Sequence, residues 1–150
     1  PFQCFVHFTE ATIPTIETSD AMVSWYNRES REVKVGGTVE VLSGTKVTLT
    51  CKYSGFPEPT VKWNVLDKEG QVIKRDEGHE VINGSLALTA LQPSDSAEYV
   101  CSVRNVAGTA SASTKLKVFG KEQSLFVVRM CLTFLSFRVS YIRVITSHPF

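Results

Sequence analysis

The stretch "DSAEYVCSVRN", Asp95 to Asn105, places a tyrosine two residues before a cysteine and an acidic residue four residues before that tyrosine. Tyr99, Cys101 and Val103 fall on one face if this segment is extended, which is the period of a strand with one buried and one hydrated side. In such a strand the inward cysteine needs a partner, and the inward tyrosine needs an acceptor for its hydroxyl. The remaining sequence supplies candidates for both.

The same alternation recurs along the middle of the chain. It is found in residues 46–53, 60–65, 85–91 and 109–118. Turn signals separate these runs, among them Ser43-Gly44, the glycine- and proline-rich residues 55–59, and Asn83-Gly84. We therefore predict an all-β, antiparallel sandwich rather than an α/β enzyme, with no helix longer than a turn before residue 120.

The inward positions of these strands answer the opening question. Cys51 and Cys101 both face inward, so they can meet across the core, and a bridge closing this loop would stabilise the fold by roughly 4 kcal/mol. Trp63 follows Cys51 by twelve residues and also faces inward, where its ring can pack on the bridge. Tyr99 occupies the place of a tyrosine corner, whose hydroxyl bonds to the backbone a few residues upstream.

Cysteine, tryptophan and Tyr-x-Cys at these spacings resemble the signature of immunoglobulin domains. The runs "GFPEPTVKW" (55–63) and "SLALTALQPSDSAEYVCSVRNVAG" (85–108) resemble the I-set branch in particular. The resemblance covers residues 33–119 and implies a Greek-key sandwich. It further implies a Cys51–Cys101 disulfide, with Trp63 and Leu88 in the core.

The resemblance also assigns roles to turn residues. It implies that Asp95 is a corner acid paired with Arg75 or Lys74, and that Asn105 and Gly108 shape the turn after residue 104. Ala97 stands where the family usually has glycine. If that position required a positive φ, alanine would be strained by about 1 kcal/mol.

A second resemblance lies upstream, in "VGGTVEVLSGTKVTLTC" (35–51). Gly36-Gly37 and residues 42–45 resemble the lead into immunoglobulin domains of ADAMTS-like, papilin-type and punctin-type matrix glycoproteins. Hemicentin-like and other cell-adhesion domains read similarly. The branch within the I-set family therefore stays open at this point.

We expect the segments on either side of the sandwich to have little regular structure. Residues 1–32 are interpreted as a linker, with a strand at its end, or as the end of a preceding module. Residues 120–150 form an apolar and basic tail, in which Arg129, Arg138 and Arg143 interrupt the apolar run. No membrane span is expected there, because a span needs about 20 predominantly apolar residues. Gly120-Lys121 can be encoded by GGT-AAG, which contains a splice-donor consensus, so we interpret residues 121–150 as intron read-through.

Catalysis and metal binding find no support in the sequence. The four cysteines, which include Cys4 and Cys131, form no CxxC pair, and the three histidines are scattered. No nucleophile elbow, zinc-protease motif or phosphate-binding glycine loop is present. We expect no catalytic residue, no metal and no cofactor. The pairing of Cys4 and Cys131 stays open.

Two classes of function remain. The first is a secreted or cell-surface recognition module of a multidomain matrix or adhesion protein. The second is an intracellular structural module of a muscle-type filament protein, in which both cysteines would stay reduced. Asn83-Gly84-Ser85 is an N-glycosylation sequon in an expected turn and favours the first class. The net charge of +1 gives no global bias toward nucleic acid or membrane.

The charged side chains of the sandwich are nevertheless unevenly distributed. Residues 40–119 carry nine basic and nine acidic side chains. Strand alternation places Lys62, Arg104, Lys115 and Lys117 on the outer face of one sheet, whereas acids gather near residues 67–80. We expect this basic face to attract a protein partner or a sulfated glycosaminoglycan. The alternative is a face that only keeps the domain soluble and guards an exposed strand edge.

Overall fold

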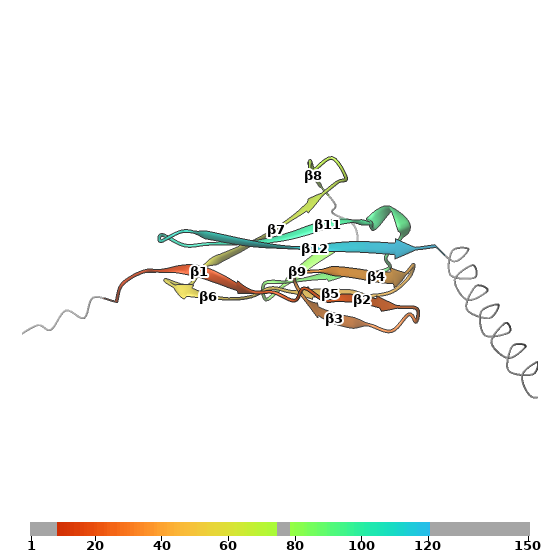
Figure 1. The fold of residues 1–150 in the computed structure, drawn as a ribbon, viewed down its shortest axis with the longest axis horizontal. Coiled ribbons are helices and arrows are strands. Elements are labelled where there is room, and N and C mark those ends of the chain that lie inside the picture. The colour runs from red at the N-terminus through yellow and green to blue at the C-terminus, as the bar shows by residue number, and fades with distance from the viewer. Residues whose placement is uncertain (1–8, 75–78, 121–150) are drawn as a thin grey trace, which may run out of the picture.

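The alternation of side chains is realised as two β-sheets packed face to face, as the computed structural model shows (Figure 1). The structure describes residues 9–74 and 79–120. The four-stranded sheet has the order β3 (Arg31–Lys34), β5 (Val47–Thr50), β10 (Ser85–Leu88) and β9 (His79–Ile82). The six-stranded sheet has the order β2 (Met22–Trp25), β4 (Thr38–Leu42), β12 (Thr109–Phe119), β11 (Ala97–Arg104), β7 (Thr60–Leu66) and β8 (Val72–Ile73). A separate ladder pairs β1 (Thr12–Glu17) with β6 (Lys52–Phe56).

The chain crosses repeatedly between the two sheets. It leaves β5 and β6 for β7 and β8, returns for β9 and β10, and passes through the 3₁₀ turn η1 (Pro93–Asp95) to β11 and β12. This is the predicted sandwich. Three ladders run parallel rather than antiparallel, namely β4 with β12, β2 with β4 and β3 with β5. Each of them includes a strand between residues 22 and 42, upstream of the alternating runs that predicted an antiparallel arrangement.

The core lies between the sheets in two clusters. The larger one is aliphatic, around Val41, Leu49 and Leu88, and includes the ring of Tyr99. The smaller one surrounds the bridge between Cys51 and Cys101. Trp63 is half-buried and packs against both clusters, so its ring joins them.

The N-terminal segment corrects one expectation. Little regular structure is expected before residue 33 apart from a strand at the end of this segment, yet β1 pairs antiparallel with β6, and β2 extends the six-stranded sheet beside β4. Pro14 lies at the register shift between Thr12 and Thr15, where a missing N–H disturbs the ladder least. Ile16, Val23 and Trp25 are half-buried against the core. Strand formation here depends on partners far away in sequence, so local alternation does not reveal it.

A glycine pair fixes where this segment crosses the domain. Gly36 and Gly37 have φ of 115° and 60°, a region that favours glycine. A Cβ atom on Gly36 would overlap the backbone of Ser19, and one on Gly37 would overlap the carbonyl of Ala21. The Ser19 N–H donates to the Val35 carbonyl at 2.9 Å, so the two stretches are in direct contact.

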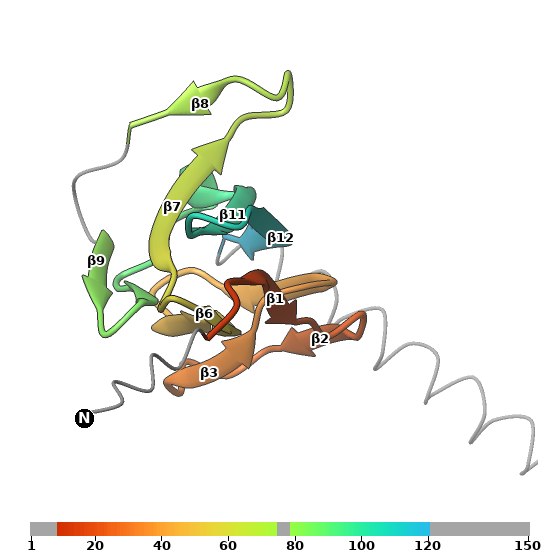
Figure 2. The ribbon, with the colours of Figure 1, turned by 90° about the vertical axis from the view of Figure 1, so that its left-hand side faces the viewer.

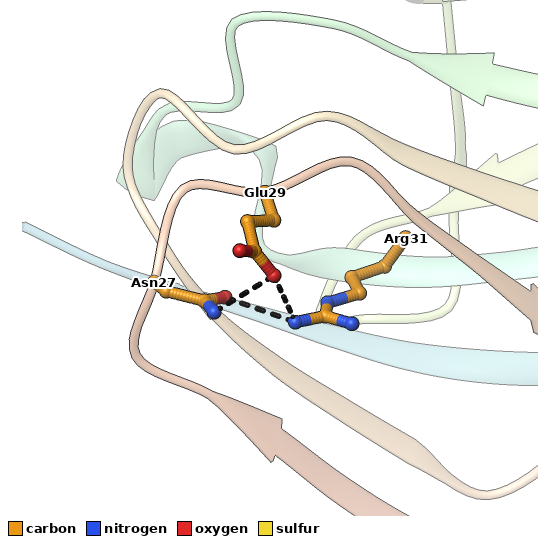
Figure 3. Close-up of polar contacts among 3 residues, drawn as sticks. All are labelled: Asn27, Glu29 and Arg31. Carbon is orange, nitrogen blue, oxygen red and sulfur yellow. Dashed lines mark hydrogen bonds and ion pairs between the residues drawn. The ribbon is translucent and has the colours of Figure 1, made fainter.

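Three polar side chains contact one another where the chain passes from β2 to β3 (Figure 3). The Asn27 amide donates to Glu29 Oε2 at 3.0 Å, and Arg31 forms an ion pair with the same carboxylate. The Arg31 guanidinium also lies 5.7 Å from the centroid of the Trp25 ring. These groups are largely exposed, so they order the connection more than they stabilise the fold. Figure 2 shows β2 and β3 side by side, with one strand belonging to each sheet.

Several sequence expectations lie outside the described residues. They concern Cys4, Arg75, Cys131 and the interpretation of residues 121–150 as intron read-through. Among residues 9–74 and 79–120, no helix is long and apolar enough to cross a membrane.

Candidate partner-binding face

The outer face of the six-stranded sheet carries the four basic residues singled out in the sequence. Strand register sets their positions: Lys62 on β7 lies opposite Ser102 on β11, and Ser102 lies opposite Ser111 on β12. Lys62, Arg104, Lys115 and Lys117 are all exposed on this face. The structure therefore brings them to one face, but to its two ends.

The first pair forms a compact cationic site. Arg104 lies two residues beyond Ser102, which is the cross-strand partner of Lys62, so Lys62 and Arg104 are diagonal neighbours on adjacent strands. Diagonal positions in a sheet are about 7–8 Å apart, within reach of one acidic group for both long side chains. Thr60, opposite Arg104, donates its hydroxyl to the Arg104 carbonyl at 3.2 Å and ties the two strand ends together.

Acidic neighbours partly neutralise the second pair. Lys117 Nζ lies 3.1 Å from Glu40 Oε1 on the adjacent β4, and Glu40 is only 8% exposed. Ser24 Oγ donates to the other carboxylate oxygen of Glu40 at 3.0 Å. Lys115 lies directly opposite Glu98 in the β11–β12 ladder. This end of the face is therefore of mixed charge rather than uniformly basic.

A shallow depression of about 320 Å³ lies at the mixed-charge end. Its lining combines the cations Lys68, Lys115 and Lys117 with the acids Asp67 and Glu98. Because the charges are of both signs, the depression favours no single class of charged ligand.

Small side chains occupy the middle of the face. Val100 and Asn64 lie opposite each other, and Ser113 continues the same row on β12. These side chains are half-buried, and none of them projects far from the sheet. A low central surface flanked by long cations permits close approach of another protein surface.

The disulfide and the tyrosine corner lie in the core beneath this face. Cys51 and Cys101 form a disulfide with a Cα–Cα distance of 6.4 Å, as the resemblance implied. The Tyr99 hydroxyl donates to the Asp95 carbonyl oxygen at 2.9 Å, so the acid of the opening stretch accepts through its backbone. Its carboxylate accepts from the Gln92 N–H at 2.7 Å and caps η1. Leu88 is fully buried, and Ala97 begins β11 without a positive φ.

Asn83 lies in the two-residue turn between β9 and β10. It is exposed, and Trp63 Nε1 donates to the carbonyl of the next residue, Gly84, at 2.9 Å. The core tryptophan thus fixes the turn that carries the sequon.

Sequence reasoning did not identify the structural roles of two residues, Glu40 and Asn105. Glu40 sits between the buried Val39 and Val41. An acid inside an apolar strand is the available signal for an ion pair with one buried partner. Asn105 was expected only to shape its turn. Its amide donates to the carbonyls of Thr12 at 2.8 Å and Pro57 at 3.0 Å, so it joins three segments of the chain.

Metal chemistry has no basis in the described part of the chain. Residues 9–74 and 79–120 contain no group of three or more histidine, cysteine or acidic side chains that could hold an ion. His79 instead packs edge-on against Tyr99, with ring centroids 5.8 Å apart.

Comparison with known proteins identifies the family. The model of the immunoglobulin I-set domain matches residues 33–118. Neural cell adhesion molecule 1 of Bos taurus is 37% identical over 103 residues, which cover 66% of this chain and 12% of the relative. Mouse hemicentin-1 is 37% identical over 54% of the chain and 1% of its own length, and human ADAMTS-like protein 1 is 31% identical over 77% and 6%. The chain thus spans about an eighth or less of these relatives.

Solved structures agree with the fold. The neural ectodermal development factor IMP-L2 superposes with a TM-score of 0.55 at 23% identity, covering 78% of this chain and 48% of that one. The four N-terminal immunoglobulin domains of Dscam1 give 0.54 at 22%, covering 75% and 26%. The I-set domain and the adhesion proteins that match it are non-enzymatic families. This chain belongs to the immunoglobulin I-set family.

Proposed function

We propose that this chain is a non-catalytic recognition module of a larger extracellular adhesion or matrix protein. It binds its partner through the outer face of the six-stranded sheet. The observation that carries the proposal is the exposed face itself, with Lys62 beside Arg104 at one end and small side chains across the middle. No described element of the chain covers these residues.

An acidic protein surface is the partner class that the geometry supports best. Two adjacent cations can hold one or two carboxylates, and the low central strip allows apolar and backbone contacts around them. A sulfated glycosaminoglycan is the second candidate, favoured by four exposed cations on one face. The Glu40 and Glu98 carboxylates beside Lys117 and Lys115 weaken this candidate, because they interrupt a continuous basic stripe.

The extracellular location is supported by the bridge and by the relatives. Disulfides persist in oxidising compartments and are rare in the cytosol. The matching adhesion and matrix proteins are cell-surface or extracellular. The alternative is an intracellular structural module of a filament-associated protein. Non-reducing mass analysis of the protein from its natural tissue separates the two, because free thiols at both Cys51 and Cys101 would support only the intracellular alternative.

Charge reversal tests the face. We compare the wild type with Lys62→Glu/Arg104→Glu, with Lys115→Glu/Lys117→Glu, and with Lys46→Glu/Lys52→Glu as a matched control away from the face. Each double variant changes the net charge by the same amount. The readout is binding of fluorescent, multimerised chains to cell surfaces, with and without heparinase treatment of the cells.

We expect Lys62→Glu/Arg104→Glu to lose binding and the control to retain it. Binding that survives heparinase identifies a protein partner, whereas binding that disappears identifies a glycosaminoglycan. Retention of the wild type on heparin at low salt, lost in the same variant, would agree with the second outcome. Equal binding by the face variants and the control would refute the proposed surface.

A further inference from the structure

The β9–β10 hairpin combines a sequon with an edge strand that pairs on one side only among the described residues. β9 is the terminal strand of the four-stranded sheet, and Figure 2 shows it at the outer side of that sheet. Val81 is 56% exposed and Ile82 is 48% exposed, although they point to opposite faces of the strand. Glu80 is the only acidic residue of β9. An edge strand with exposed apolar side chains pairs readily with another chain.

The turn presents the Asn83 side chain to solvent in a fixed position. Ile82 and Ser85 pair with each other, and the two residues between them have φ of 49° and 80°, which is the pattern of a type I′ turn. Within the described residues, the Asn83 side-chain amide has no hydrogen-bond partner, and the residue is exposed. The bond from Trp63 to the Gly84 carbonyl holds the turn against β7.

We propose that Asn83 carries an N-linked glycan that shields the edge of β9. The sequon Asn83-Gly84-Ser85 provides the acceptor amide, and a glycan is bulky and strongly hydrated. Val81 is two residues away, about 7 Å along the strand, so the first sugars can cover both apolar side chains. This inference rests on the proposed extracellular location, since N-glycans are added in the secretory pathway.

The first experiment tests the modification. The full chain is secreted from a mammalian cell line, and its intact mass is measured before and after treatment with an amidase that removes N-glycans. Asn83→Asp and Ser85→Ala both remove the sequon, and aspartate tolerates the left-handed backbone of the turn. Ser85→Thr keeps the sequon as the matched control. We expect glycan mass on the wild type and on Ser85→Thr, and none on the other two.

The second experiment tests shielding. Sedimentation velocity compares glycosylated wild type with the enzymatically deglycosylated chain and with Ser85→Ala. We expect the glycan-free chains to shift toward dimers and larger species at high concentration. Adding Val81→Thr and Ile82→Thr to Ser85→Ala should restore the monomer. Identical distributions for glycosylated and glycan-free chains would disprove the shielding role.

The state of the disulfide separates failure of this inference from failure of the proposed function. The same mass spectra report whether Cys51 and Cys101 are bridged. A bridged, secreted chain with an unmodified Asn83 overturns the glycan assignment and leaves the extracellular module intact. Free thiols at both cysteines would overturn the proposed location, and the glycan with it.

Discussion

At Tyr99, one hydroxyl connects the buried centre of the sandwich to the corner before β11. The side chain is fully buried, and its hydroxyl donates to the Asp95 carbonyl at 2.9 Å. Tyr99→Phe should lower the free energy of unfolding by about 1 kcal/mol, because the donor is lost and the carbonyl remains. Urea denaturation followed by tryptophan fluorescence measures the change. Tyr53→Phe is the control, since that ring is half-exposed. Equal midpoints for the two variants would contradict the role of the hydroxyl.

Asn105 joins more of the chain than its place in a turn suggests. Its amide nitrogen donates to Thr12 and Pro57, and its oxygen accepts from the N–H groups of Ala107 and Gly108, at 2.9 and 3.2 Å. Asn105→Asp keeps the acceptor and replaces the donor with a carboxylate facing two carbonyl oxygens. We expect a loss of roughly 2 kcal/mol at neutral pH, about the value of two hydrogen bonds.

Protonation of the introduced aspartate tests the donor role of Asn105. A protonated aspartic acid regains a donor, so the penalty of Asn105→Asp relative to wild type should shrink as the pH falls below about 4. Asn105→Ala, which loses all four bonds, should show no such recovery. The measurement is the difference in urea midpoint between each variant and the wild type at pH 7 and pH 3.5. A penalty for aspartate that is unchanged by pH would argue against the donor role.

At the scale of elements, β1 and β2 depend on the glycine pair that they cross. Gly36→Ala introduces a Cβ into the backbone of Ser19 at a φ that disfavours alanine. We expect a cost above the ~1 kcal/mol that the conformation alone requires. Gly70→Ala is a matched control, because Gly70 has φ of 79° and no atom within 4 Å of an added Cβ. Thermal or urea unfolding of both variants measures the excess, and equal penalties would indicate that residues 19–21 do not pack there.

The strands β1 and β2 also show which parts of the fold the sequence does not predict. Alternation in residues 46–53 and 98–104 is strong because each strand has one buried face, and it correctly placed Cys51, Cys101 and Tyr99 in the interior. Neither β1 nor β2 carries a sustained alternation, because Pro14 interrupts β1 and β2 is only four residues long. In the sequence, Gly36-Gly37 stands out only through the family resemblance. Its conformational requirement becomes visible only when residues 19–21 are seen against it.

The candidate face shows a similar limit. Alternation correctly predicted that Lys62, Arg104, Lys115 and Lys117 are exposed on one sheet. It did not predict that Glu40 neutralises Lys117, because the parallel pairing of β4 with β12 sets that contact. The charge of a side chain follows from the sequence, whereas its electrostatic surroundings follow from strand register.

At the scale of the whole molecule, the two sheets differ in what they expose. The six-stranded sheet presents cations and small side chains, and the four-stranded sheet ends in the apolar edge of β9 beside the Asn83 turn. The Asn83 turn is fixed against β7, the strand that carries Lys62, by the hydrogen bond from Trp63 to the Gly84 carbonyl. The proposed glycan and a partner bound at Lys62 would therefore lie on neighbouring parts of the molecule.

The N-terminal segment raises the question of where the folding unit begins. The family match starts at residue 33, but β1 pairs with β6, and Ile16, Val23 and Trp25 pack against the core. We compare a chain that begins at Thr9 with one that begins at Arg31, both ending at residue 120. Removing the segment deletes these three half-buried side chains and uncovers the core residues beneath them, so the shorter chain should be less stable by about 2–4 kcal/mol.

The deletion should also expose strand edges and so promote association of the shorter chain. Without β1 and β2, the free edges of β6 and β4 face solvent and can pair with another chain. We expect the shorter chain to unfold at a lower urea concentration and to associate at high concentration, as measured by light scattering. Gly36→Ala provides the internal check, because its penalty in the shorter chain should fall to that of Gly70→Ala once Ser19 is gone. If both chains instead unfold at the same midpoint, residues 9–30 are a linker after all, and the domain begins where the family match does.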